Sequence, residues 1–253
     1  MTENLPTALA AVVLTALAVA TLTVVGVRLR RGVLVAVLRA VLQLTVVALV
    51  LRGVLAVPLA VVLVLGVMLT TAGWKAGRRV AVLPGALRAA VLSCAAGTFP
   101  VLLVVFAVGA LPLQGRYVVA VAGIVIGGTM TASTLAGRRF VAGMVDRRDE
   151  VEGWLALGAT PRRAVRDIAR TATAEASLPA VDQTRTTGLV TLPGAFVGAL
   201  VGGASPAGAT RFQVVVLAGL RAAGSVAAAT LLHLLGDPRT LPESTGPPRV
   251  GRR

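Results

Sequence analysis

Polar side chains inside long apolar runs are the residues of this sequence that could do chemistry. Arg39 and Gln43 stand one helical turn apart in one run, and Arg221 stands alone in another. A polar group in hydrocarbon is costly, so each is a candidate for a pathway or a binding site. Arg39 could instead snorkel to the nearer membrane surface, and Gln43 could bond across helices. Arg221 calls for a wet cavity, an anionic substrate group, or a structural bond to helix-end carbonyls.

A second polar group lies near residue 130. Threonine hydroxyls often bond the carbonyls of their own helix, and neighbouring glycines favour close helix packing. The group therefore predicts either a tight helix contact or a further part of the pathway. Its members are Thr129, Met130, Thr131 and Thr134, directly after Gly127 and Gly128.

Ligands and nucleophiles are scarce. His233 is the sole histidine, Cys94 is the sole cysteine, and no carboxylate falls clearly within an apolar run. A tight transition-metal cage needs several such ligands, so a metal would be held weakly, shared across a dimer, or moved as a complex. Serines 133 and 205 lack the context of a catalytic triad, and Lys75 lacks that of a phosphate-binding loop. We therefore expect neither enzyme activity nor a cofactor bound by this chain.

The chain is 56% hydrophobic and 14% charged, with a mean hydropathy of +0.87, which indicates a membrane protein. Membrane-spanning helices must therefore position these residues. A spanning helix needs about 20 mostly apolar residues. The sequence thus predicts an all-α polytopic membrane protein with one membrane domain over residues 1–236. Seven runs meet this length, at about 7–27, 33–51, 54–73, 89–109, 117–137, 187–204 and 211–235.

The net charge of +15 is explained by topology. Of the 25 Lys and Arg residues, 20 flank the runs on one side and three on the other. The positive-inside rule then places the N-terminus outside and the C-terminus in the cytoplasm. Aromatic residues make up 3% of the chain, too few to stack nucleic-acid bases, so the lipid bilayer is the expected partner. The proline-rich residues 237–253 are predicted to form a disordered cytoplasmic tail.

One connection, from about 138 to 186, is long and charged, and it is predicted to be helical. Thr160 can cap a helix whose first residue is Pro161, so one helix should end and another begin there. This elbow could insert into a groove on a cytosolic partner, or its helices could lie among lipid headgroups. Asp182 and Glu175 could attract a cation at the cytoplasmic entrance, but the helical spacing of Asp182 and Arg185 favours a surface pair. The break carries an apolar knob made of Leu155, Leu157, Gly158 and Ala159.

Four segments together resemble the FetB family of ABC permeases, over about Arg39 to His233. They are RAVLQL, GIVIGGTMTASTLAGRRF, EGWLALGATPRRAVRDIAR and LPAVDQTRTTGLVTLPGAFVGALVGGASPAGATRFQ. That family is described as iron exporters, with distant relatives among plant permeases linked to aluminium tolerance. The resemblance implies a permease subunit in the bacterial inner membrane, a homodimer, and ATP bound by a separate cytosolic ATPase.

The elbow also resembles the coupling loop of bacterial ABC importers, in which a Glu, a Gly and a downstream Ile recur. Here these fall on Glu152, Gly158 and Ile168, whereas the closing Leu-Pro of that pattern appears only at residues 178–179. The resemblance therefore implies ATPase coupling without fixing the direction of transport. The implied coupling residues are Glu152, Leu155, Leu157, Gly158, Ala159, Thr160 and Pro161.

Two other interpretations remain open. The chain could be a carrier that works without an ATPase, or a structural membrane protein. A membrane-embedded enzyme is the third class, and the missing catalytic motifs disfavour it.

Overall fold

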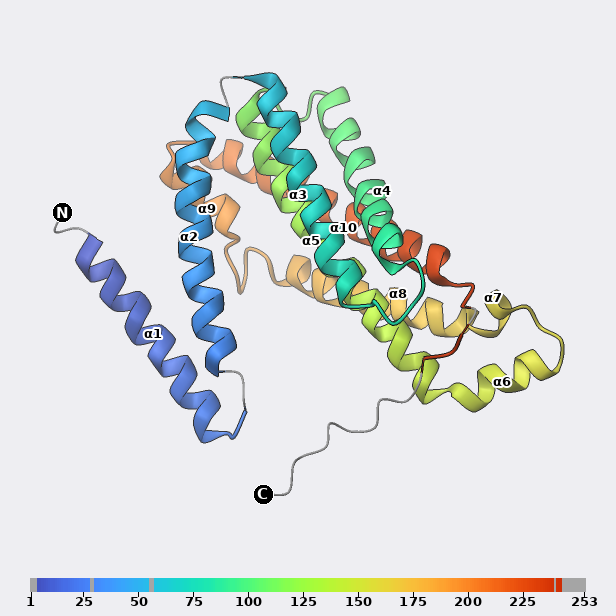
Figure 1. The fold of residues 1–253 in the computed structure, drawn as a ribbon. Helices are drawn as coiled ribbons and strands as arrows, with labels where there is room; N and C mark the ends of the chain where they lie inside the picture. Colours follow the sequence, from blue (N-terminus) through green and yellow to red (C-terminus); the bar gives the residue numbers. More distant parts are fainter. Residues whose placement is uncertain (1–3, 28–29, 55–56, 239, 243–253) are drawn as a thin grey trace. The chain divides into compact units, whose positions relative to one another are not determined.

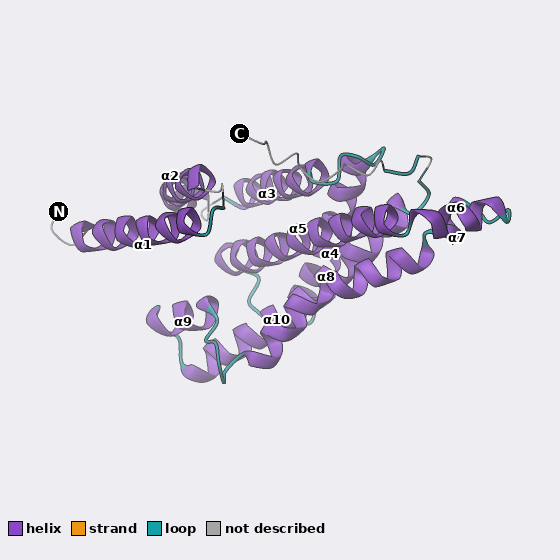
Figure 2. Cartoon of the chain, turned by 90° about the horizontal axis from the view of Figure 1, so that it is seen from below, coloured by secondary structure: helices purple, strands orange, loops and turns teal. Residues whose placement is uncertain are grey.

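A computed structural model describes residues 4–27, 30–54, 57–238 and 240–242. Within those ranges the regular secondary structure is all α-helical, apart from an isolated β-bridge between Thr187 and Thr191 (Figure 2). The chain forms two compact units, residues 1–60 and 61–253. The single membrane domain expected over residues 1–236 thus takes the form of two units, which are described separately below.

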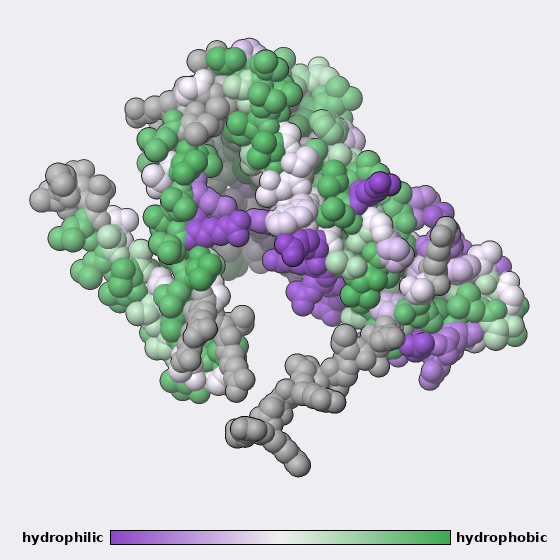
Figure 3. Space-filling view, in the orientation of Figure 1, coloured by the Kyte–Doolittle hydropathy of each residue, from purple (hydrophilic) through white to green (hydrophobic). Residues whose placement is uncertain are grey.

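The first unit is a helical hairpin made of α1 (Asn4–Val24) and α2 (Arg30–Val54). None of its described side chains is buried, and most are Leu, Val or Ala. Figure 3 shows the visible face of α1 as largely hydrophobic. Helices that are apolar all round are suited to lipid rather than to water.

The second unit is a bundle in which α4, α5 and α10 pack against one another and α8 lies along α5 and α10 (Figure 1). Two short helices, α6 and α7, connect α5 to α8. A third, α9, precedes α10. The bounds are α3 (Pro58–Arg78), α4 (Ala86–Ala107), α5 (Gly115–Asp146), α6 (Arg148–Ala156), α7 (Pro161–Ala164), α8 (Arg166–Thr186), α9 (Gly194–Val201) and α10 (Pro206–Leu235).

Small residues allow α4, α5 and α10 to approach closely. A Cβ atom at Gly97 would collide with the carbonyl oxygen of Ala223 and lie 2.8 Å from Cγ2 of Thr129. The hydroxyls of Ser93 and Ser133, both fully buried, are 3.0 Å apart and join α4 to α5. Close backbone approach and buried hydroxyl contacts are typical of helix packing within membranes.

Six helices of the described residues are long and apolar enough to cross a membrane, namely α1, α2, α3, α4, α5 and α10. They correspond to six of the seven predicted runs. The seventh run, 187–204, is not an unbroken helix, because only the eight residues of α9 are helical there. Eight residues rise about 12 Å, far short of the roughly 30 Å of a bilayer core. Gly188 has a φ of +88° and Pro193 immediately precedes α9, so the apolar run is interrupted twice.

The connection over 138–186 is almost entirely helical, as predicted. α5 continues nine residues past the predicted boundary of 137, to Asp146. α8 buries Ile168, Ala172 and Ala176 at a spacing of four residues, which is one face of a helix. An ion pair of 3.1 Å between Arg139 and Glu175 also links α5 to α8. The second half of this segment therefore belongs to the bundle.

The first residues of the predicted disordered tail also pack against the bundle. Pro238 and Pro242 are buried, and Leu241 contacts the apolar cluster that includes Phe140 and Leu231. The tail was predicted to be disordered from residue 237 onward, whereas these residues contact the bundle. The other residues of the predicted tail, 239 and 243–253, lie outside the described residues.

Candidate functional site

The elbow between α6 and α7 is built from backbone hydrogen bonds. At the end of α6, Ala159 N–H donates to the Trp154 carbonyl (3.0 Å), and Gly158 N–H donates to the Leu155 carbonyl (2.9 Å). This is the Schellman arrangement, which requires a left-handed residue after the helix. Gly158 supplies it with a φ of +84°. The reversal of the chain thus depends on that glycine.

The next helix begins as the sequence predicts. Thr160 is the N-cap of α7, its hydroxyl accepts from Arg163 N–H at 3.4 Å, and Pro161 is the first helical residue. A second contact ties this end to the bundle, because Arg162 Nη2 donates to the His233 carbonyl at 2.8 Å. The elbow is therefore held at the end of α10 as well as at the end of α5.

Apolar side chains are exposed on the elbow. Leu157 is 82% exposed, Leu155 is 37% exposed and Trp154 is 41% exposed, whereas Val151 is buried and anchors α6. Figure 1 shows α6 projecting beyond the end of α5. Trp154 was not predicted as part of the knob, although an aromatic ring next to the predicted helix break indicates a contact surface. The knob is therefore larger and more hydrophobic than predicted.

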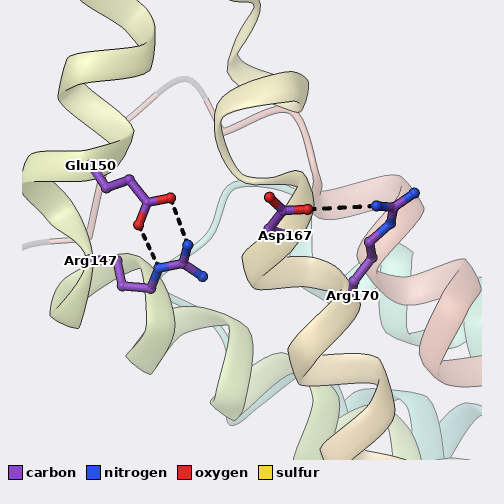
Figure 4. A network of polar contacts seen from close by, with 4 residues as sticks. All are labelled: Arg147, Glu150, Asp167 and Arg170. Carbon is purple, nitrogen blue, oxygen red and sulfur yellow. Dashed lines mark hydrogen bonds and ion pairs between the residues drawn. The ribbon is translucent and has the colours of Figure 1, made fainter.

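Ion pairs set the start of α6. Arg147 donates two hydrogen bonds to Glu150, at 2.8 and 2.6 Å (Figure 4), and Arg148 bonds Glu152 at 2.7 Å. The bonds from Arg147 lower the pKa of the Glu150 carboxyl and raise that of the guanidinium. Both groups are thus charged at neutral pH. Glu152, predicted as a coupling residue, lies exposed in its own pair.

The predicted threonine group divides between two environments. Thr129 is fully buried and donates to the Ile126 carbonyl, and Met130 packs against apolar clusters. Thr134 is also buried. Thr131 alone reaches a cavity, where it bonds the Gly127 carbonyl. Tight helix packing, one of the two interpretations, therefore describes most of this group.

The cavity that Thr131 reaches has a volume of about 290 Å³ and lies between α5, α8 and α10. Arg221 lines it from α10. Sequence reasoning missed Ser177, Gln183 and Ser225, which line it too. Ser225 follows Arg221 by one helical turn, a spacing that could have identified it. The other two come from α8, whose packing against α10 was not predicted.

Arg39 and Gln43 lie on α2, in the first unit, and both are exposed there. Their predicted spacing of one turn is present in the helix. The structure places Thr131 and Arg221 at one cavity, but it does not assign Arg39 or Gln43 to that cavity.

Six long apolar helices, a cavity between α5, α8 and α10 and a projecting elbow define a multi-pass α-helical membrane protein. The chain belongs to the uncharacterised protein family UPF0014, whose family model matches residues 6–237.

Three relatives illustrate the range of this family. UPF0014 membrane protein STAR2 of Oryza sativa is 35% identical over 90% of this chain and 80% of its own length. Protein ALUMINUM SENSITIVE 3 of Arabidopsis thaliana is 34% identical over 66% of this chain and 61% of its own. The Escherichia coli protein named "Probable iron export permease protein FetB" is 27% identical over 74% of this chain and 73% of its own. No solved structure matches the chain.

Proposed function

We propose that this chain is the membrane-spanning permease subunit of an ABC transporter in a bacterial inner membrane. A separate cytosolic ATPase would bind the ATP and dock on the elbow around Gly158. The exposed knob carries this proposal, because Trp154, Leu155 and Leu157 protrude on a turn fixed by backbone bonds. Aromatic and aliphatic anchors of this kind are what a groove on a partner buries.

The helix that follows the elbow supports a coupling role. α8 follows α7 after a single intervening residue, Val165, and its second half lines the cavity that contains Arg221. A displacement of the elbow would therefore move a helix that forms one wall of that cavity. Alternating access requires such a rigid connection between the ATPase and the pathway.

We further propose seven crossings, six by long helices and one by the broken segment α8–α9. The first half of α8 lines a groove together with the C-terminal end of α10, and α9 lines another together with the N-terminal ends of α5 and α10. The segment thus passes from one end of the bundle to the other. Discontinuous helices of this kind often line substrate sites in transporters. With an odd number of crossings, the basic elbow and C-terminus face the cytoplasm and the N-terminus lies outside.

A homodimer is the proposed assembly, because the seven crossings of one chain make at most half of a translocation pathway. Iron or another metal ion or complex is the cargo that the name of the FetB relative suggests. The alternative function is an ATPase-independent carrier or a structural membrane protein. Transport in liposomes that contain this chain alone would favour that alternative.

Leu157→Asp tests the docking surface. We expect about tenfold or greater loss of co-purification with the ABC ATPase partner, because an unpaired charge would be buried at the interface. Leu113→Asp is the matched control, since Leu113 is 77% exposed and precedes α5, at the opposite end from the elbow. Equal loss in both variants, or in neither, would contradict docking at the elbow.

A further inference from the structure

The guanidinium of Arg221 has no partner among the described residues. Its Nε atom is buried and makes no hydrogen bond. The carboxylates of α8 are already engaged elsewhere, because Glu175 pairs with Arg139 and Asp182 pairs with Arg185, as predicted for the last pair. An unpaired charge among membrane helices is expensive, so its persistence calls for an anion or polar acceptor that binds there.

The cavity around Arg221 offers further hydrogen-bond donors and no acidic group. Its polar lining consists of Thr131, Ser177, Gln183 and Ser225. No Asp or Glu is among the described residues that line it. The hydroxyls of Thr131 and Ser177 donate to the carbonyls of Gly127 and Thr173, which leaves the Gln183 amide, the Ser225 hydroxyl and the Arg221 guanidinium as donors toward a ligand. Donors of these kinds around one space can surround the oxygen atoms of a carboxylate or a phosphate.

The cavity adjoins a larger groove at the end of the bundle that carries the elbow. The groove has a volume of about 950 Å³, and it shares Ser177 and Ser225 with the cavity. The described residues that line it include no carboxylate, and only the Arg170 side chain has a neighbouring acid, Asp167 at 3.6 Å (Figure 4). Four guanidinium groups line the groove, from Arg162, Arg163, Arg166 and Arg170.

This arrangement attracts anions and repels cations. A cleft lined by one sign of charge concentrates ligands of the opposite sign. The basic groove would collect an anion at the membrane surface, the two serines would form a polar connection, and Arg221 would bind the charged group at the inner end. The charged side chains that line this seam are all arginines, so they repel a bare metal cation.

We propose that the seam between α8 and α10 is the entry path and binding site for an anionic substrate that carries carboxylate or phosphate groups, with Arg221 as its principal ligand. The inference rests on the proposed permease function and specifies its substrate class. A metal would pass through this seam as an anionic complex.

Citrate and pyrophosphate are suitable probes of the site. We would add each to the purified chain in nanodiscs of phosphatidylcholine, without any ATPase, and follow the midpoint of thermal unfolding. Saturable stabilisation of the unaltered chain is expected, with an apparent affinity about tenfold lower in Arg221→Gln. Arg138→Gln is the matched control, because Arg138 is an exposed arginine of α5 outside both linings, and it should bind like the unaltered chain.

Two further comparisons keep the result interpretable. Arg221→Lys retains the charge and should bind more weakly than the unaltered chain but more tightly than Arg221→Gln, which separates ligand loss from a folding defect. Identical stabilisation of all four proteins, or of none, would overturn the proposal. Stabilisation by phosphatidylglycerol in the nanodisc alone, abolished by Arg221→Gln, would also overturn it, because a lipid headgroup would then occupy the site. None of these outcomes depends on an ATPase, so they are independent of the docking proposal.

Discussion

Gly158→Val is expected to abolish ATP hydrolysis coupled to this membrane protein while leaving its insertion and yield unchanged. Gly158 has a φ of +84°, which a β-branched residue adopts only under strain of about 1–3 kcal/mol. A Cβ atom there would meet nothing within 4 Å, so the damage is confined to the backbone turn. The measurement is ATPase activity of the reconstituted permease–ATPase complex, which should fall to that of the isolated ATPase.

Two variants control for the substitution itself. Gly158→Asn should retain most of the coupled activity, because asparagine tolerates the left-handed conformation. Gly153→Val places the same side chain on α6, where a Cβ atom also meets nothing within 4 Å and φ is not positive. It should retain coupling as well. Full coupled activity in Gly158→Val would contradict a role for the shape of the elbow.

Gly97→Ala is expected to cause the largest loss of stability of any single-methyl addition in the bundle. The new Cβ would collide with the backbone oxygen of Ala223, so α4 and α10 would have to separate. Overpacking of a rigid contact typically costs about 1–3 kcal/mol. A lower midpoint of thermal unfolding in detergent, with a reduced yield from membranes, is the predicted measurement.

Gly66→Ala is the matched control for that experiment. Gly66 is an exposed residue of α3, and a Cβ atom there meets nothing within 4 Å. Alanine at such a helical position should be neutral or stabilising by about 0.5–1 kcal/mol. An unfolding midpoint for Gly97→Ala equal to that of Gly66→Ala would show that α4 and α10 do not pack as described.

The positions of the long helices could be predicted from the sequence because lipid imposes a simple requirement of length and apolarity. The start of α7 could also be predicted, since Thr160 and Pro161 are local signals of a helix start. The hydropathy of residues 187–204 predicted an unbroken spanning helix, which was wrong because Gly188 and Pro193 interrupt the helix there. Hydropathy also did not predict that α8 packs in the bundle, because the buried face of α8 is formed mainly by alanine within a charged segment.

The candidate site was only partly predictable for a related reason. Arg221 is conspicuous in an apolar run, and its isolation was visible in the sequence. Ser177 and Gln183 are ordinary residues of a polar segment, and they become candidates only because α8 packs against α10. Thr129, in contrast, is fully buried and does not line the cavity, and its hydroxyl donates to its own helix. These outcomes depend on tertiary contacts, which no local pattern encodes.

Photo-crosslinking from position 157 tests whether an ABC ATPase docks on the elbow of this membrane protein. With benzoylphenylalanine in place of Leu157, irradiated membranes that contain both proteins should yield a covalent adduct between this chain and the ATPase. The same probe at Leu113 should yield none. An adduct with lipid alone from position 157, with the ATPase present and active, would contradict the claim.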